Sequence, residues 1–185
     1  MGIDRLGIFI QVRLGSQRLA AKALLPLGGS TVIEQAMAAL RAVPADCYAL
    51  LTDASSAPAL AAPAGRHGYA VVVGPAEDVL ARYEAAAVRF ATGTVVRATG
   101  DSPLVSARLA REIIGIHRAA DADLSHYLGC PLGTGVEVIA ARALAEAARL
   151  AEDAAEREHM STYLYRHRDR FTVLEPAVPP ELTHL

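Results

Sequence analysis

Short apolar runs alternate with segments of helical periodicity along most of the chain, and this alternation limits the fold more than any other feature. In residues 31–43, for example, apolar side chains recur at the three- and four-residue spacing of an amphipathic helix. The expected strands are residues 6–12, 47–52, 69–74 and 94–100, and the expected helices are residues 31–43, 76–90 and 106–120 with a weaker helix ending near residue 67. Strands that are apolar along their whole length are typical of a parallel sheet covered by helices on both faces. The sequence therefore predicts an α/β protein with a mostly parallel sheet.

The rhythm changes after residue 123. Residues 124–140 predict two short strands joined by a Gly/Pro loop, and residues 142–171 have an almost uninterrupted helical pattern. Residues 171–175 predict a final strand. Because nothing in the sequence is typical of an interdomain linker, we expect residues 1–185 to form a single domain.

Two helix starts have recognisable capping residues. Ser30 or Thr31 is expected to cap the helix of residues 31–43, with Glu34 placed to complete a capping box. Ser106 is expected to cap the helix that follows it.

The overall charge argues against a polyanionic partner. The net charge of the 185-residue chain is −2, which provides no broad positive field for nucleic acid or an anionic membrane. Cys47 and Cys130 lie far apart and lack metal-ligand spacing, so we favour reduced thiols, with a disulfide left open. No apolar run approaches the roughly 20 residues that span a bilayer, and the N-terminus does not resemble a secretory signal. We therefore expect a cytoplasmic protein that binds neither nucleic acid nor membranes.

The loop after the first expected strand combines glycine with several cations. Gly15 and Ser16 follow the strand, and Arg13, Arg18 and Lys22 surround them. In a parallel sheet ligands collect at the carboxyl ends of the strands, where a Gly-rich turn lets backbone N–H groups approach an anion. Three cations suit a triphosphate, although a solvated turn with exposed bases explains the same residues. The loop matches neither a Walker A sequence nor GxGxxG, which argues against a dehydrogenase.

An aspartate follows another expected strand at the same edge of the sheet. Asp101 could hold Mg²⁺ against phosphate oxygens, with Ser102 nearby. The alternative is a turn in which Asp101 hydrogen-bonds its own backbone before Pro103.

Four ordered segments resemble one enzyme family. IQVRLGSQRLAAKALLPLGGSTVIEQAM (10–37) is similar to the start of the cytidylyltransferases typified by spore-coat polysaccharide synthesis proteins, which are related to the CMP-acylneuraminate and CMP-3-deoxy-manno-octulosonate synthetases. GPAEDVLARYEAAA (74–87), VVRATGDSPLV (95–105) and EREHMSTYLYRHRDRF (156–171) are similar to later segments of the same family. The resemblance implies a Rossmann-like three-layer nucleotidyltransferase fold.

The resemblance also implies an activity and a nucleotide site. An acceptor oxygen would attack the α-phosphorus of CTP and expel pyrophosphate, with Mg²⁺ as cofactor and a sugar or sugar-like acceptor. The implied roles are triphosphate binding by the backbone of Leu14, Gly15 and Ser16 with Arg13, Arg18 and Lys22, metal binding by Asp101, and contact with the nucleotide by Arg97 and Thr99. Arg13, Lys22 and Asp101 would be the catalytic residues.

The implied acceptor residues are less distinctive. By resemblance, Glu77, Asp78, Arg82 and Tyr83 shape the acceptor pocket, but acids at an exposed first helix turn also interact favourably with the helix dipole. Glu137 is a further acceptor ligand or, alternatively, a paired structural carboxylate. The family has an aspartate where this chain has Gly135.

One stretch near the C-terminus could contact a substrate or a second subunit. His159, Tyr163, Tyr165 and His167 are expected on one helix, where residues four apart share a face. We favour a partly buried amphipathic stripe, with a homodimer left open.

The family also has a C-terminal segment that these 185 residues do not contain. By resemblance, that segment carries the second metal-ligating aspartate, without which metal-assisted transfer is weakened. We therefore expect a cytidylyltransferase for surface polysaccharide or glycan synthesis, whose activity depends on whether the segment is part of the whole protein. The alternative is a catalytically impaired nucleotide-binding module that acts as a regulator or scaffold.

Overall fold

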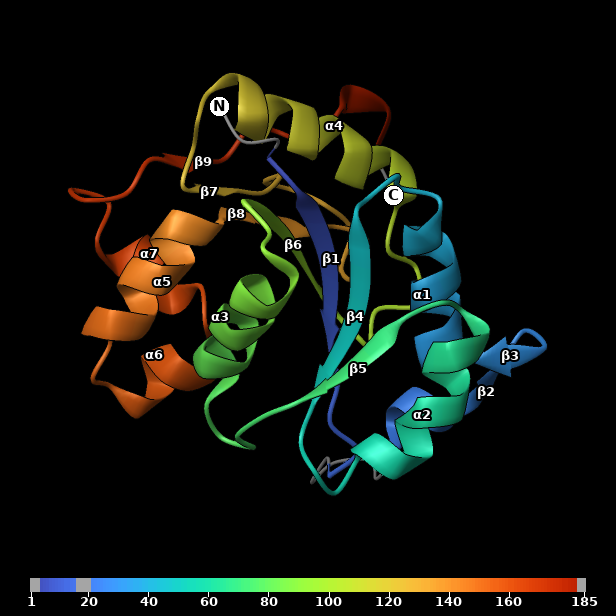
Figure 1. Cartoon of the computed structure of the whole chain (residues 1–185). Helices are drawn as coiled ribbons and strands as arrows, with labels where there is room; N and C mark the ends of the chain where they lie inside the picture. The colour runs from blue at the N-terminus through green and yellow to red at the C-terminus, as the bar shows by residue number, and fades with distance from the viewer. Residues whose placement is uncertain (1–3, 16–20, 183–185) are drawn as a thin grey trace.

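The computed structural model describes residues 4–15 and 21–182, and a mixed seven-stranded sheet lies at its centre (Figure 1). The strands are β1 (Leu6–Gln11), β4 (Cys47–Thr52), β5 (Ala70–Val73), β6 (Thr94–Thr99), β7 (Leu124–Ser125), β8 (Glu137–Ala140) and β9 (Val173–Leu174). Their order across the sheet is β5-β4-β1-β6-β8-β7-β9. β5, β4, β1 and β6 are parallel, β8 is antiparallel to β6 and β7, and β9 is parallel to β7. The predicted α/β class with a mostly parallel sheet is confirmed.

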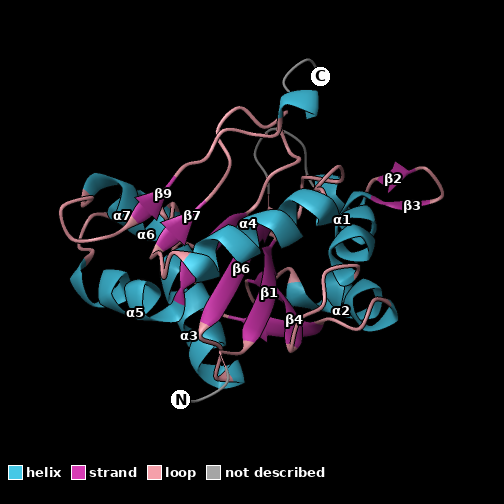
Figure 2. Cartoon of the chain, turned by 90° about the horizontal axis from the view of Figure 1, so that it is seen from above, coloured by secondary structure: helices cyan, strands magenta, loops and turns pink. Residues whose placement is uncertain are grey.

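Helices cover both faces of the sheet (Figures 1 and 2). On one face lie α1 (Val32–Arg41), α2 (Ala57–Arg66) and α4 (Ala107–Ala119). On the other lie α3 (Val79–Phe90), α5 (Ala141–Leu150), α6 (Ala154–Glu158) and α7 (Thr162–Arg166). Side chains of β1 alternate between these two layers, with Ile8 and Ile10 in the first core and Phe9 in the second. A continuous apolar strand is therefore needed because both of its faces are buried.

The predicted helix caps are present. The Thr31 hydroxyl and backbone N–H of Thr31 both contact Glu34 Oε2, at 2.8 and 3.1 Å, and the capping box is complete. Ser106 Oγ accepts a hydrogen bond of 3.3 Å from the backbone N–H of Leu109 at the start of α4.

The segment after the first loop contains elements that the periodicity did not predict. A 3-10 helix, η1 (Lys22–Leu24), precedes an antiparallel hairpin of β2 (Pro26–Leu27) and β3 (Ser30–Thr31). The hairpin stands away from the sheet beside α1 (Figure 1).

The prediction of one nearly continuous helix in residues 142–171 is wrong. The backbone becomes extended at Ala151, and the side chain of Asp153 accepts a hydrogen bond from Ala155 N–H to start α6. A second break at His159 separates α6 from α7 and lets Met160 enter the core fully buried. Side chains such as aspartate favour caps over helix interiors, so a local polar contact interrupts the helical pattern.

Two further expectations concern the thiols and membrane spans. Cys47 and Cys130 are both free and half-buried. Among residues 4–15 and 21–182, none of the helices has both the length and the apolar character to span a bilayer.

The strand order places a crevice at one edge of the sheet. From β1 the chain continues to β4 and β5 on one side, whereas β6 lies on the other side of β1. The connections that leave β1 and β6 therefore diverge at the carboxyl ends of these strands. In open α/β sheets this point of reversal is where ligands bind.

Candidate active site at the carboxyl ends of β1 and β6

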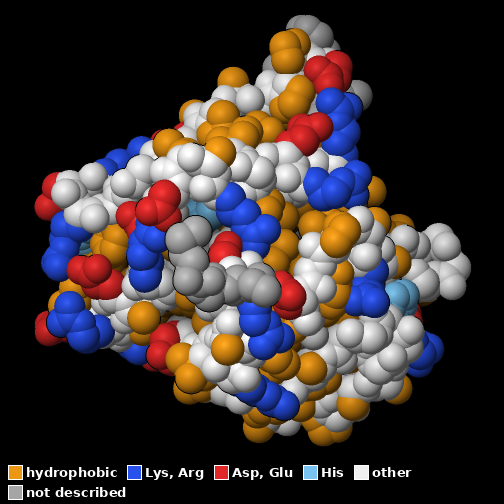
Figure 3. Space-filling model, turned by 45° about the horizontal axis from the view of Figure 1, so that its top comes forward, with side chains coloured by type: hydrophobic (Ala, Val, Ile, Leu, Met, Phe, Trp, Pro, Cys, Tyr) orange, Lys and Arg blue, Asp and Glu red, His pale blue; other side chains and the backbone are white. Residues whose placement is uncertain are grey.

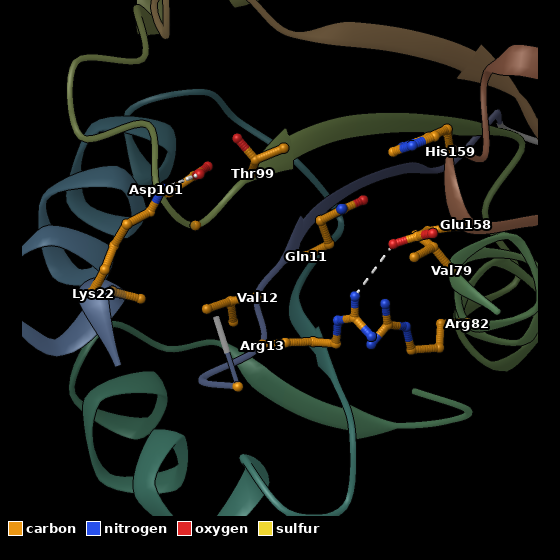
Figure 4. A pocket seen from close by; sticks show the side chains of 13 residues that line it. Gln11, Val12, Arg13, Lys22, Val79, Arg82, Thr99, Asp101, Glu158 and His159 are labelled. Carbon is orange, nitrogen blue, oxygen red and sulfur yellow. Dashed lines mark hydrogen bonds and ion pairs between the residues drawn. The ribbon is translucent and has the colours of Figure 1, made fainter. Parts of the chain in front are cut away.

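A cavity of about 320 Å³ opens where β1 and β6 end, and we call it the switch-point cavity (Figure 4). Its lining comes from the last residues of β1 and β6 with those that follow them, from η1, from α3 and from the end of α6. Arg13, Lys22 and Arg82 supply its positive charges, and Asp101 and Glu158 its negative charges. Segments far apart in sequence therefore meet around one polar hollow.

Lys22 and Asp101 face each other across this cavity. Lys22 Nζ lies 2.6 Å from Asp101 Oδ2. Burial disfavours the charged carboxylate, but hydrogen bonds from Lys22 and Thr99 outweigh it and hold the pKa of Asp101 below its ordinary value. The loop that carries Lys22 and the turn that carries Asp101 thus form two walls of the same site.

The turn after β6 depends on a close approach of the backbone at Gly100. A Cβ atom there would lie 2.7 Å from Val12 Cβ and 2.8 Å from Ile33 Cδ1. Gly100 N–H also donates a 2.8 Å hydrogen bond to the carbonyl of Gln11. Glycine lets the chain pass tightly over the end of β1, which brings Asp101 toward Lys22.

The described ends of the first loop are anchored. Leu14 N–H donates to Ser56 Oγ at 3.0 Å, and Ala21 N–H donates to the Leu14 carbonyl at 3.0 Å. The amide of Leu14 is therefore engaged by the protein, in contrast to its expected role in the phosphate cradle. Gly15 lines the cavity, whereas Ser16 and Arg18, which we also expect to bind phosphate, lie outside the described residues.

The anchor at Ser56 is itself rigidly held. Asp53 accepts from the backbone N–H of Ser56 at 2.8 Å and from the hydroxyls of Ser55 and Ser56 at 2.6 and 3.1 Å. Burial acts to raise the pKa of Asp53, but these hydrogen bonds outweigh it and keep that pKa below its ordinary value. The loop start is therefore fixed by residues that follow the neighbouring strand β4.

Arg13 points across the cavity toward α3 and α6. Its guanidinium donates to the Ala76 carbonyl at 2.6 Å and lies 3.4 Å from Glu77 and 3.6 Å from Glu158. Glu77 is highly exposed, and its contact with Arg13 is long, so this pair adds little to stability.

Arg82 is the largest of the fully buried side chains. It is 1% exposed, it lines the switch-point cavity, and its Nε and Nη1 atoms have no hydrogen-bond partner among the described residues. Burial, followed by the nearby positive charge of Arg13, lowers its pKa. Buried arginines are ordinarily paired with an acid. Because Arg82 has unpaired nitrogens, the cavity differs from a site in which all charges are paired within the protein.

A second cavity of about 250 Å³ lies toward β8, and we call it the β8 cavity. Arg97 donates to Glu137 Oε2 at 2.6 Å, and Tyr165 donates to Glu137 Oε1 at 2.8 Å. Burial works against the charged guanidinium, but Glu137 raises the pKa of Arg97 overall. Thr99 lines both cavities, so they adjoin at this residue.

The five predicted acceptor residues do not share a pocket. Tyr83 is fully buried, and its hydroxyl lies 3.3 Å from the carbonyls of Phe9 and Ala98, so direct contact with an acceptor is ruled out in this structure. Asp78 caps α3 through Ala81 N–H and pairs with Arg157 at 2.6 Å, as the alternative of a helix-start acid expects. Of the predicted set, Arg82 lines the switch-point cavity and Glu137 lines the β8 cavity.

Two residues around the cavities were not predicted from the sequence. Gln11 at the end of β1 and Glu158 at the end of α6 both line the switch-point cavity, and so does His159, which the sequence offered as a possible substrate contact. The position of Gln11 just before Arg13 is a signal that could have found it. Glu158 and His159 belong to a segment whose helical pattern concealed the break between α6 and α7. The rings of Tyr163 and His167 are in contact, with centroids 4.2 Å apart and planes tilted by 36°.

No preformed metal cage exists among residues 4–15 and 21–182, since no group of three or more His, Cys, Asp or Glu side chains converges there. Mg²⁺ in phosphate sites is usually held by one or two carboxylates together with the substrate's phosphates. Asp101 fits that pattern as a single protein ligand. Because Lys22 engages Asp101 Oδ2, metal binding through this oxygen requires the lysine to move.

The opposite side of the molecule, which includes α4, has a different character. Figure 3 shows positively and negatively charged side chains intermixed there. Arg118 pairs with Asp4 at 2.9 Å, and Arg142 pairs with Asp121 and Asp123 at 2.7 and 3.0 Å. These charges are compensated within the protein.

An α/β sheet with cations and an aspartate at its switch point is typical of nucleotide-binding proteins of the doubly wound class. A sequence model of the family described as cytidylyltransferase matches residues 8–180. The chain therefore belongs to the cytidylyltransferase family, and it is a nucleotidyltransferase. The family predicted from the four sequence segments is confirmed.

Individual relatives agree with this assignment. The chain is 30% identical over 165 residues to the spore coat polysaccharide biosynthesis protein SpsF of Bacillus subtilis, a match that covers 85% of this chain and 69% of SpsF. A cytidylyltransferase from Leptospira borgpetersenii has a similar structure, with a TM-score of 0.88 and 24% identity over 94% of this chain and 76% of that one. The CMP:2-keto-3-deoxy-manno-octonic acid synthetase solved with CTP has a TM-score of 0.74 and 14% identity, covering 94% of this chain and 90% of its own. At these identities the two structural likenesses show the shared fold alone.

Proposed function

We propose that this chain transfers CMP from CTP to a hydroxyl group of a sugar or sugar-like acceptor and releases pyrophosphate. Membership of the cytidylyltransferase family supports the transfer. Similarity to SpsF and the fold shared with the CTP-bound synthetase support a role in surface polysaccharide or glycan synthesis.

The observation that carries the proposal is the contact of Lys22 with Asp101 at 2.6 Å. It brings the cationic loop after β1 to the carboxylate after β6, at the edge of the sheet where nucleotides bind. Had these two side chains lain on opposite faces, phosphate and metal binding could not occur at one site.

The protein's part in the reaction is charge neutralisation and positioning. The acceptor oxygen forms a bond to the α-phosphorus and its hydroxyl proton passes to solvent, while the bond from that phosphorus to the bridging oxygen breaks and pyrophosphate leaves with the bonding electrons. Lys22 and Arg13 neutralise the negative charge of the triphosphate, and a charge-assisted contact of this kind is stronger than a neutral hydrogen bond. Asp101 would hold Mg²⁺, which when bound offsets further phosphate charge.

We place the acceptor in the β8 cavity. Thr99 borders both cavities, so an acceptor there lies next to a nucleotide in the switch-point cavity. The Arg97–Glu137 pair supplies a polar wall whose charges already compensate one another, and Tyr165 donates a hydrogen bond to Glu137. Such a wall suits the hydroxyl groups of a sugar.

Release of pyrophosphate tests this function. We expect release from CTP and Mg²⁺ with an accepted sugar, and much slower release from UTP or GTP or when the acceptor is omitted. Binding of CTP without turnover with any sugar acceptor would contradict the enzymatic proposal and favour a nucleotide-binding module.

A further inference from the structure

Arg82 has a charge that the described part of the protein does not balance. Its guanidinium is buried, and neither Nε nor Nη1 donates a hydrogen bond to any described residue. An unpaired buried charge carries a large desolvation penalty. A bound anion would supply the missing partner and offset this penalty.

The surroundings increase the imbalance. In Figure 4 the guanidinium groups of Arg82 and Arg13 lie next to each other on one side of the cavity, below Glu158. After Tyr83, the groups that favour the charge of Arg82 are Asp53 and Asp78. Both are engaged elsewhere, Asp53 by two serines and Asp78 by Arg157 and a helix N–H.

The side chain of Arg82 is also positioned with precision. A Cβ atom on Gly74 would lie only 2.6 Å from Arg82 Cγ, so the loop after β5 packs directly against the arginine stem. Gly74 N–H is bonded to the Thr52 carbonyl at 3.0 Å, which holds this loop in place. The absence of a side chain at Gly74 therefore allows Arg82 to occupy its position beside Arg13.

We propose that Arg82, together with Arg13, binds a phosphate group of the nucleotide. This role differs from the acceptor contact that the sequence resemblance implies for Arg82, and it rests on the proposed function for the identity of the anion. Arg82 then completes the cationic lining opposite the Lys22–Asp101 wall.

A phosphate fits these two residues better than a carboxylate. A guanidinium carries five N–H donors in a planar fork, and those of Arg82 and Arg13 lie side by side, with Nη1 of Arg13 already donating to the Ala76 carbonyl. A phosphate group has three outward oxygens and more negative charge than a carboxylate, so it can accept from both forks at once.

Calorimetry on Arg82→Met tests the proposal, with Arg89→Met as the matched control. Arg89 lies on the same helix but is exposed and borders neither cavity. We expect Arg82→Met to weaken binding of both CTP and inorganic tripolyphosphate about tenfold to a hundredfold, because charge-assisted bonds are lost. Arg89→Met should leave both affinities unchanged.

Thermal unfolding separates binding from a structural role. Without ligand, Arg82→Met should keep the wild-type Tm or raise it by about 2–4 °C, since methionine removes an unpaired buried charge. Gly74→Ala provides a second variant, in which the arginine is retained but displaced, and we expect weaker tripolyphosphate binding there too.

Two results would overturn the proposal, and they differ from a failure of the proposed function. Arg82→Met with wild-type affinity for both ligands excludes a phosphate contact. Weakened binding of an acidic sugar alone, with tripolyphosphate unaffected, would assign Arg82 to the acceptor instead. If the wild type binds tripolyphosphate but not CTP, the cytidylyltransferase proposal fails, while the Arg82 variants still decide the phosphate site.

Discussion

Two arginines with little solvent exposure line adjoining cavities, but their surroundings differ. Arg97 of β6 is paired with Glu137 at 2.6 Å, and Tyr165 satisfies the other oxygen of that carboxylate. Arg82 of α3 is more deeply buried and has two guanidinium nitrogens without a partner among the described residues. One charge is balanced within the fold, and the other is not.

This difference separates the roles of the two cavities. A balanced charge fixes the geometry of a polar wall without attracting ions strongly, as expected for the recognition of hydroxyl groups. An unbalanced one beside Arg13 attracts an anion, as expected for the recognition of phosphate. Removing each kind of charge should therefore have opposite effects on stability and binding.

The largest effect is expected at Asp101, the carboxylate of the switch-point cavity. Asp101→Asn keeps the size of the side chain but removes the charge proposed to hold Mg²⁺, so metal-dependent turnover should fall by about a hundredfold or more. Pyrophosphate release measures this loss. The fold should remain intact because the side chain is 45% exposed, and retained full activity would remove Asp101 from the mechanism.

A substitution of Arg97 tests whether its pairing with Glu137 stabilises the fold. Arg97→Met leaves the Glu137 carboxylate, only 16% exposed, without its cation, and should lower the free energy of unfolding by about 2–4 kcal/mol. Urea denaturation measures the change. Adding Glu137→Met should recover part of the lost stability, whereas an Arg97→Met protein as stable as the wild type would show that the pair does not stabilise this wall.

Lys22 is the next test of the switch-point cavity. Lys22→Ala should weaken CTP binding by about 1–3 kcal/mol if the lysine makes a charge-assisted contact with the triphosphate. The variant should also raise the pKa of Asp101, because it removes the Lys22 hydrogen bond that lowers that pKa. Titration calorimetry measures the affinity, and an unchanged value would argue against the triphosphate site.

The smallest effect is expected at Glu34, a carboxylate that borders neither cavity. Hydrogen bonds from Arg66 and Thr31 lower the pKa of Glu34 to about 2 from an ordinary 4.5. A depressed folded-state pKa stabilises the fold above the unfolded pKa, and this contribution disappears as the pH falls from about 4.5 to about 2.

Glu34→Gln should therefore destabilise the protein near pH 7 by about 1–2 kcal/mol, a value reduced because Arg66 is 60% exposed. Unfolding curves at pH 7 and pH 3 measure the difference, which should be smaller at pH 3. The affinity for CTP should not change. A pH-independent difference would show that the ionised form of Glu34 contributes nothing.

Much of the architecture could be read from local sequence. Short-range patterns predict the continuous apolar strands and the capping residues Thr31, Glu34 and Ser106. They also place Lys22 in the loop region after β1 and Asp101 just after β6. Because parallel strands align their carboxyl ends, these patterns were enough to predict that Lys22 and Asp101 face the same crevice.

Local patterns failed where a distant contact or a backbone break decided the outcome. The long helical pattern near the C-terminus was interrupted by the Asp153 cap and the break at His159. The engagement of the Leu14 amide required Ser56, which lies 42 residues further along the chain. Tyr83, predicted beside the acceptor, turned inward because its helix packs that face on the sheet.

By itself, the sequence determined the α/β class, the family and the cationic loop with its aspartate, since these depend on periodicity and short motifs. Only the tertiary structure decided that Arg97 has a carboxylate partner while Arg82 has none among the described residues. The sequence alone does not show whether an arginine is paired with an acid. Whether its charge is balanced depends on which strands and helices the sheet order brings beside it, and on how much water they exclude.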